Sequence, residues 1–203
     1  MNLKKIKIIA IIGIFLLSFP AHFLYDLFPN SLTSIFFPVN ESIWEHMKII
    51  FTTTCLYGII DYILLRKNNI AFSNFKAQLF ITSFFSIPIY LAIYLPLNYF
   101  IGENLFISIF LLLITYTISQ IISYYILSSK PIPYLNFLAT PLIILIYILF
   151  TILTYLPPHN YLFYDTNTNS YGIPKEHINS NNWYTPFFIN YTNFLAVRTI
   201  CAE

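Results

Sequence analysis

The stretch "NLFISIFLLLITYTISQIISYYIL", Asn104 to Leu127, contains no charged side chain. A helix needs about 20 mainly apolar residues to cross a bilayer core about 30 Å thick, so this stretch is long enough for one crossing. The whole chain of 203 residues is 58% apolar and only 9% charged. Both values lie outside the range of soluble globular domains, so the sequence predicts a membrane protein.

Four further apolar stretches are also long enough to cross a bilayer. They run from Ile6 to Leu24, from Ile43 to Leu65, from Ala77 to Phe100 and from Tyr134 to Leu156. The first begins with basic residues, like a signal peptide, but Pro20 and its bulky neighbours stand where a cleavage site requires small residues. We therefore expect an all-α polytopic membrane protein with five transmembrane helices.

Basic residues predict the orientation of these helices. Seven of them flank the helices on one side: Lys4, Lys5, Lys7, Arg66, Lys67, Lys76 and Lys130. The positive-inside rule makes that side cytoplasmic, which places the N-terminus inside and the C-terminal tail outside. We expect a five-helix transmembrane domain at 1–156 and an exoplasmic tail at 157–203, partly ordered against the interface of the cell membrane.

Several classes of function are excluded or disfavoured. A net charge of +2 without a basic patch argues against nucleic acid as a partner. Two cysteines, Cys55 and Cys201, are too few for a disulfide framework or a structural zinc site of the cysteine type. The zinc-protease pattern H-E-x-x-H, the P-loop and the hydrolase pattern G-x-S-x-G are absent from the sequence.

All four histidines fall on the predicted outer side. They are His22, His46, His159 and His177, and five of the acids join them there: Asp26, Glu41, Glu45, Glu103 and Asp165. In the first span, Ser18, His22 and Asp26 recur every four residues and share one helix face. A carboxylate one turn from a histidine can orient the imidazole as a metal ligand or general base, although a plain interfacial pair has the same spacing.

The motif "FPVNESIWEHMK", Phe37 to Lys48, stands at the outer start of the second span. Ser42 and Glu45 have the spacing of a capping box, which accounts for one glutamate. Capping does not account for Glu41 or His46, and ionisable groups that enter a membrane helix indicate a functional site. Glu41, Glu45 and His46 are therefore the candidate catalytic residues.

A second polar motif, "YLPPHNYLFYDTNTNSYGI", spans Tyr155 to Ile173 on the same predicted side. It contributes a histidine and an aspartate that taken alone also suit a surface loop. Imidazole and carboxylate side chains are ligands of divalent metals such as zinc. The candidate metal ligands are therefore His22, Asp26, His46, His159 and Asp165.

The motif P-V-N-E-S-x-W-E-H, from Pro38 to His46, resembles that of an uncharacterised family of small bacterial integral membrane proteins. The resemblance extends over roughly Lys5 to Ile173. It implies a five-helix membrane protein whose function is unknown, and it assigns no catalytic residues.

Three functions stay open at this point. The outer site could bind a divalent metal, and an enzyme built on it would be a metal-dependent hydrolase acting at the outer membrane interface. The polar groups could instead form a path for protons or a small solute together with Asp61. Such a path would require an oligomer, because five helices are few for a transporter that acts as a monomer. The chain could also be a non-catalytic scaffold or a subunit bound to another membrane protein. The lipid bilayer is the partner common to all three.

Overall fold

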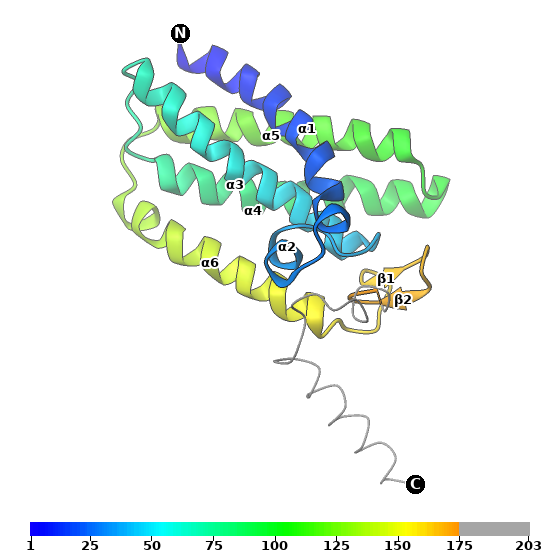
Figure 1. Cartoon of the computed structure of the whole chain (residues 1–203). Helices are drawn as coiled ribbons and strands as arrows, with labels where there is room; N and C mark the ends of the chain where they lie inside the picture. Colours follow the sequence, from blue (N-terminus) through cyan, green and yellow to red (C-terminus); the bar gives the residue numbers. More distant parts are fainter. Residues whose placement is uncertain (175–203) are drawn as a thin grey trace, which may run out of the picture.

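The computed structural model describes residues 1–174, and within them the chain is almost entirely helical (Figure 1). The helices are α1 (Leu3–Leu27), α2 (Ser31–Phe36), α3 (Ile43–Lys67), α4 (Phe75–Ile101), α5 (Leu105–Ser128) and α6 (Pro133–Tyr155). All except α2 are long and apolar enough to cross a membrane. The predicted all-α polytopic fold is confirmed. Both ends of each predicted span lie within three residues of the ends of the corresponding helix.

Four of the long helices form a bundle in which each one packs against two others. Helix α1 packs on α3 and α5, and α4 completes the ring by packing on the same two helices. Helix α6 lies outside this ring against α4, and the short α2 packs on α6. Figure 1 shows the α3–α4 and α5–α6 connections at one end and the α4–α5 turn at the other. The end with the α4–α5 turn carries the candidate site.

Several polar side chains inside the bundle are paired with one another, because a buried polar group needs a partner where water is absent. The Tyr116 hydroxyl of α5 lies 2.8 Å from the Ser18 hydroxyl of α1 and 3.1 Å from the Thr53 hydroxyl of α3. Towards the opposite end from the site, Lys7 of α1 forms a buried ion pair with Asp61 of α3. These contacts tie α1, α3 and α5 together along their length.

Two small elements were not predicted. The first is α2, whose start is a capping box: the Asn30 side chain accepts from the Thr33 backbone N–H, and the Thr33 hydroxyl accepts from the Asn30 N–H. The second is a hairpin in which β1 (Tyr164–Asp165) pairs antiparallel with β2 (Ser170–Tyr171). Both elements lie near the end of the bundle that carries the candidate site (Figure 1).

Candidate metal centre

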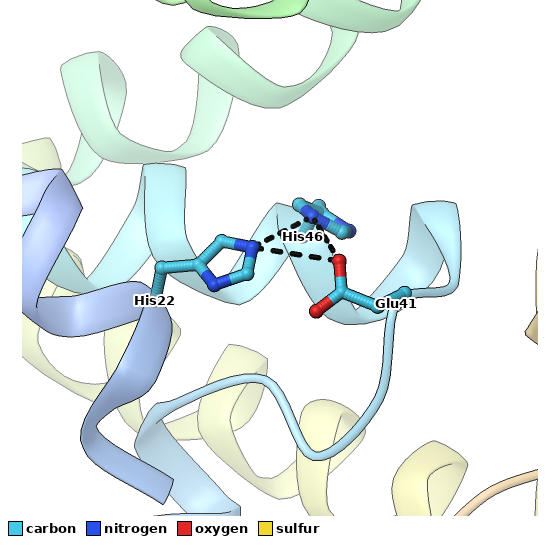
Figure 2. Close-up of side chains that lie close together, drawn as sticks. All are labelled: His22, Glu41 and His46. Carbon is cyan, nitrogen blue, oxygen red and sulfur yellow. Dashed lines mark hydrogen bonds and ion pairs between the residues drawn. The ribbon is translucent and has the colours of Figure 1, made fainter. Parts of the chain in front are cut away.

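Three side chains from different parts of the chain meet at one point (Figure 2). His22 lies in the last two turns of α1, His46 in the first turn of α3, and Glu41 in the loop before α3. The Nε2 atoms of the two histidines are 3.2 Å apart. The Glu41 Oε2 atom lies 3.5 Å from the Nε2 of His22 and 3.4 Å from the Nε2 of His46. Two imidazoles and a carboxylate therefore direct one donor atom each at a common centre.

The three distances fit the geometry of a tetrahedral metal site. Ligand atoms at about 2.0 to 2.1 Å from a tetrahedral zinc lie about 3.3 to 3.4 Å from one another. The observed 3.2, 3.4 and 3.5 Å differ from that edge length by no more than about 0.2 Å. The donors already have the spacing that such an ion requires.

The protonation of His46 also suits a metal ligand. Its Nδ1 atom lies 2.9 Å from the backbone carbonyl of Ser42, one turn earlier. A carbonyl oxygen can only accept, so Nδ1 carries the proton and donates it. In the neutral ring, Nε2 is then left with a lone pair that faces His22 and Glu41. A backbone carbonyl that fixes the tautomer in this way is a common second partner of metal-binding histidines.

The electrostatics around Glu41 show that its carboxylate is held as an anion. Hydrogen bonding from His22 and then from His46 lowers the pKa of Glu41 well below its ordinary value, against the opposing effect of partial burial. The Glu41 carboxylate accepts from an Nε2–H group where a ring carries its proton there, and a ring that loses that proton offers its Nε2 lone pair to a metal instead. An anionic carboxylate that faces two imidazole nitrogens provides, together with them, three ligand atoms for a metal cation.

Glu45 has a different role from Glu41 and His46, because its side chain is buried and both of its carboxylate oxygens have partners. Its Oε2 accepts from the Val39 backbone N–H at 3.0 Å and from Lys48 Nζ at 2.7 Å, and its Oε1 accepts from the Thr154 hydroxyl at 2.7 Å. Lys48 also donates to the Ser34 carbonyl at 2.8 Å. This buried pair therefore holds the α2–α3 loop, which carries Glu41, against α3 and α6.

The start of α3 differs in one detail from the predicted capping box. Ser42 is the N-cap, and its hydroxyl accepts from the Glu45 backbone N–H at 3.3 Å. The Glu45 carboxylate does not return to the Ser42 N–H, because that donor is taken by the Asn40 side chain at 2.9 Å. It turns to the Val39 N–H instead, which makes Glu45 a clamp on the loop as well as part of the helix start.

The β1–β2 hairpin covers the site from one side and is fixed there by three contacts. The Trp44 backbone N–H donates to the Leu162 carbonyl at 2.8 Å, and the Asn40 side chain donates to the Gly172 carbonyl at 2.7 Å. The Trp44 indole stacks on the Phe163 ring with centroids 4.8 Å apart. The motif residues at the start of α3 therefore bind the hairpin on one face and expose His46 on another.

A cavity of about 360 Å³ opens beside the three donors. His22, Glu41 and His46 form part of its wall. The rest includes Tyr90 and Tyr94 of α4, Glu103 of the α4–α5 turn, and Tyr161 and Tyr164 from the segment after α6. Its volume is in the range of small-molecule sites. A ligand in this cavity would lie directly against the donor atoms.

The other predicted metal ligands lie elsewhere. His159 is exposed and stacks on the Tyr171 ring, with centroids 4.5 Å apart. Asp165 is buried and organises the hairpin turn by accepting from the Asn167 N–H at 2.9 Å and the Thr168 hydroxyl at 2.7 Å. Asp26 is exposed at the end of α1. It does not orient His22, whose buried Nδ1 has no hydrogen-bond partner among the described residues.

The cluster thus contains members of both predicted groups, the metal ligands and the catalytic residues. His22 and His46 come from the predicted metal ligands, and Glu41 comes from the predicted catalytic residues. The sequence places Glu103 on the same side without indicating a role for it. It does not mark the cavity tyrosines either, because the spacing of Tyr90 and Tyr94 on α4 is that of any buried helix face. His177 lies outside the described residues.

Comparisons with known proteins identify the family without identifying an activity. The model of a family of unknown function, DUF6512, matches residues 1–173. Neither the curated proteins nor the solved structures gave a match.

Proposed function

We propose a metal-dependent function for this chain, which belongs to DUF6512, a family that assigns it no activity. In this proposal His22, Glu41 and His46 bind a divalent metal ion, preferably zinc. We further propose that this centre hydrolyses an ester or amide at the outer interface of the cell membrane. The observation that carries the proposal is the set of mutual donor distances of 3.2, 3.4 and 3.5 Å beside a cavity.

The donor set supports zinc and a catalytic role. Two histidines and one glutamate are a ligand combination of catalytic zinc sites, which keep a fourth position open, whereas structural zinc sites have four protein ligands. Among residues 1–174, the group that can hold an ion has three members. Since all three line the cavity, an ion held by them would be open to water or substrate from the cavity.

The chemistry that follows is hydrolysis. Zinc lowers the pKa of a bound water to about 7, which supplies hydroxide at neutral pH. That hydroxide adds to the carbonyl carbon of an ester or amide, and the bond from this carbon to the alcohol oxygen or amine nitrogen then breaks. The leaving atom takes up the proton released from the attacking water. The products are a carboxylic acid and an alcohol or amine, so the balance needs no redox partner.

The alternatives have weaker support in the geometry. A transport path through Asp61 would need a carboxylate free to exchange its partner, but Asp61 is buried and paired with Lys7. A scaffold needs no cavity, and the space of about 360 Å³ beside three converging donors has no use in that role.

Metal analysis of detergent-purified chain, prepared without chelator and without a histidine tag, tests the proposal. We expect about one zinc per chain in the wild type and loss of the metal in His22→Ala, Glu41→Ala and His46→Ala. His159→Ala is the matched control, because it removes an imidazole from the same end of the protein outside the cluster, and it should retain zinc. A wild type that takes up no metal even after zinc addition would overturn the proposal.

A further inference from the structure

We propose that the cavity beside the metal centre binds a positively charged ammonium group of the substrate, with Glu103 as its counter-charge and the cavity tyrosines as its aromatic wall. This inference deepens the proposed function by naming a substrate class, and it rests on that function for the reaction. The binding of the cation itself requires no metal.

The charge of Glu103 favours a cation on its side of the cavity. The wall contains two carboxylates, Glu41 and Glu103, and none of its lining residues within 1–174 is a lysine or arginine. Glu41 neutralises only one of the two charges of a divalent ion at the centre, and Glu103 is the carboxylate of the wall that is not a ligand of that ion. Within the described residues, Glu103 forms no ion pair with another side chain. Its carboxylate is therefore available to a ligand.

The aromatic wall is the second independent indication. Tyr90 and Tyr94 stack with ring centroids 5.3 Å apart and an angle of 16° between their planes. Tyr161 and Tyr164 line the cavity from the segment after α6. Ammonium groups bind over the faces of aromatic rings, and several rings next to a carboxylate are the arrangement that recognises quaternary ammonium ions. Four tyrosines and Glu103 line the same cavity and so provide these elements together.

The same wall argues against anionic substrates. A phosphate or a free carboxylate would face Glu103 with no lysine or arginine in the described wall to offset the repulsion. The metal would be its only cationic partner there, and that position is needed for the carbonyl oxygen and the attacking water. A carbonyl compound that also carries an ammonium group fits both halves of the cavity.

The surroundings allow the ammonium group to come from a lipid or from solution. Phe100 near the end of α4 and Phe106 near the start of α5 lie on either side of the turn that carries Glu103, and they are 81% and 82% exposed. Aromatic side chains at a helix end commonly lie at the membrane interface, so the turn places Glu103 near the level of lipid headgroups. The cavity is large enough for a small soluble amine as well.

Two probes of equal shape test the charge requirement. Choline and its uncharged isostere 3,3-dimethylbutan-1-ol are titrated into zinc-loaded protein by calorimetry. We expect choline to bind about tenfold tighter in the wild type and this preference to vanish in Glu103→Gln. Asp26→Asn, which removes an exposed carboxylate that does not line the cavity, should keep it. Equal binding of both probes by the wild type, or a full choline preference in Glu103→Gln, would overturn the inference.

Separate readouts distinguish this inference from the metal proposal. Glu103→Gln should keep its zinc while it loses the choline preference, and His46→Ala should lose zinc while it keeps that preference. Repeating the titration in nanodiscs then identifies the source of the group. If a trimethylammonium lipid mixed into neutral lipid weakens choline binding, the cation comes from a lipid headgroup; if choline binding is unchanged, it comes from a soluble amine.

Discussion

His22 and His46 bring their Nε2 atoms within 3.2 Å although they belong to different helices and lie 24 positions apart in the chain. The contact joins the C-terminal end of α1 to the first turn of α3, and Glu41 completes it from the loop between them. Any ion that binds there links α1, the loop and α3. Metal binding and the stability of this part of the bundle are therefore coupled.

The first prediction concerns the effect of a chelator. Removing a bound ion from the native state costs RT ln(1 + [L]/Kd), which is about 2.7 kcal/mol at a hundredfold excess over Kd. We therefore expect a chelator to lower the thermal midpoint of the wild type in detergent. His46→Ala, which lacks a ligand, should show no chelator effect, and His159→Ala should respond like the wild type. A chelator effect of equal size in His46→Ala would contradict a site at these residues.

The second prediction concerns pH and the metal-free protein. The two histidines lower the pKa of Glu41 in the folded state below its ordinary value of 4.5. A depressed carboxylate pKa stabilises the folded protein above the unfolded value and loses this effect as pH falls through the folded pKa. Glu41→Gln should therefore be less stable than the wild type at pH 7, and the difference should shrink below about pH 4.5. A difference that grows on acidification would have the wrong sign.

The third prediction concerns the buried pair of Glu45 and Lys48. Removing one partner of a buried ion pair leaves an uncompensated charge and costs about 3 to 5 kcal/mol. We expect Lys48→Met to lower the thermal midpoint strongly and to weaken zinc binding, because the loop that carries Glu41 loses its clamp. The double variant with Glu45→Gln removes both charges, and it should unfold at a higher temperature than Lys48→Met alone. Additive losses in the double variant would show that the two residues act independently.

The fourth prediction concerns orientation, which the proposed site at the outer interface requires. In a background with Cys55→Ser and Cys201→Ser, a cysteine is placed at Thr166 in the hairpin or at Asn69 in the α3–α4 connection, which are both exposed. A membrane-impermeant maleimide should label Thr166→Cys in intact cells and Asn69→Cys only after lysis. The reverse pattern would place the metal centre on the cytoplasmic side.

Much of the fold follows from the sequence because its signals are local. An uncharged run such as Asn104 to Leu127 must be helical in a bilayer, since a helix satisfies its own backbone groups within the segment. Caps and prolines then fix the ends, and Ser42 begins α3 in the structure as its position predicts. The capping box of Asn30 and Thr33 had the same local character and would have revealed α2.

The candidate site depended on the tertiary structure for a physical reason. Helical periodicity shows which residues share a face of one helix, but it does not give the rotation of that helix against its neighbours. His22 and Asp26 share a face of α1, yet only His22 faces α3, and Asp26 is exposed to solvent. The sequence therefore determined the helices and the end of the bundle where the histidines gather. The packing of α1 on α3, with the loop held by Glu45 and Lys48, decided that His22, Glu41 and His46 form the centre.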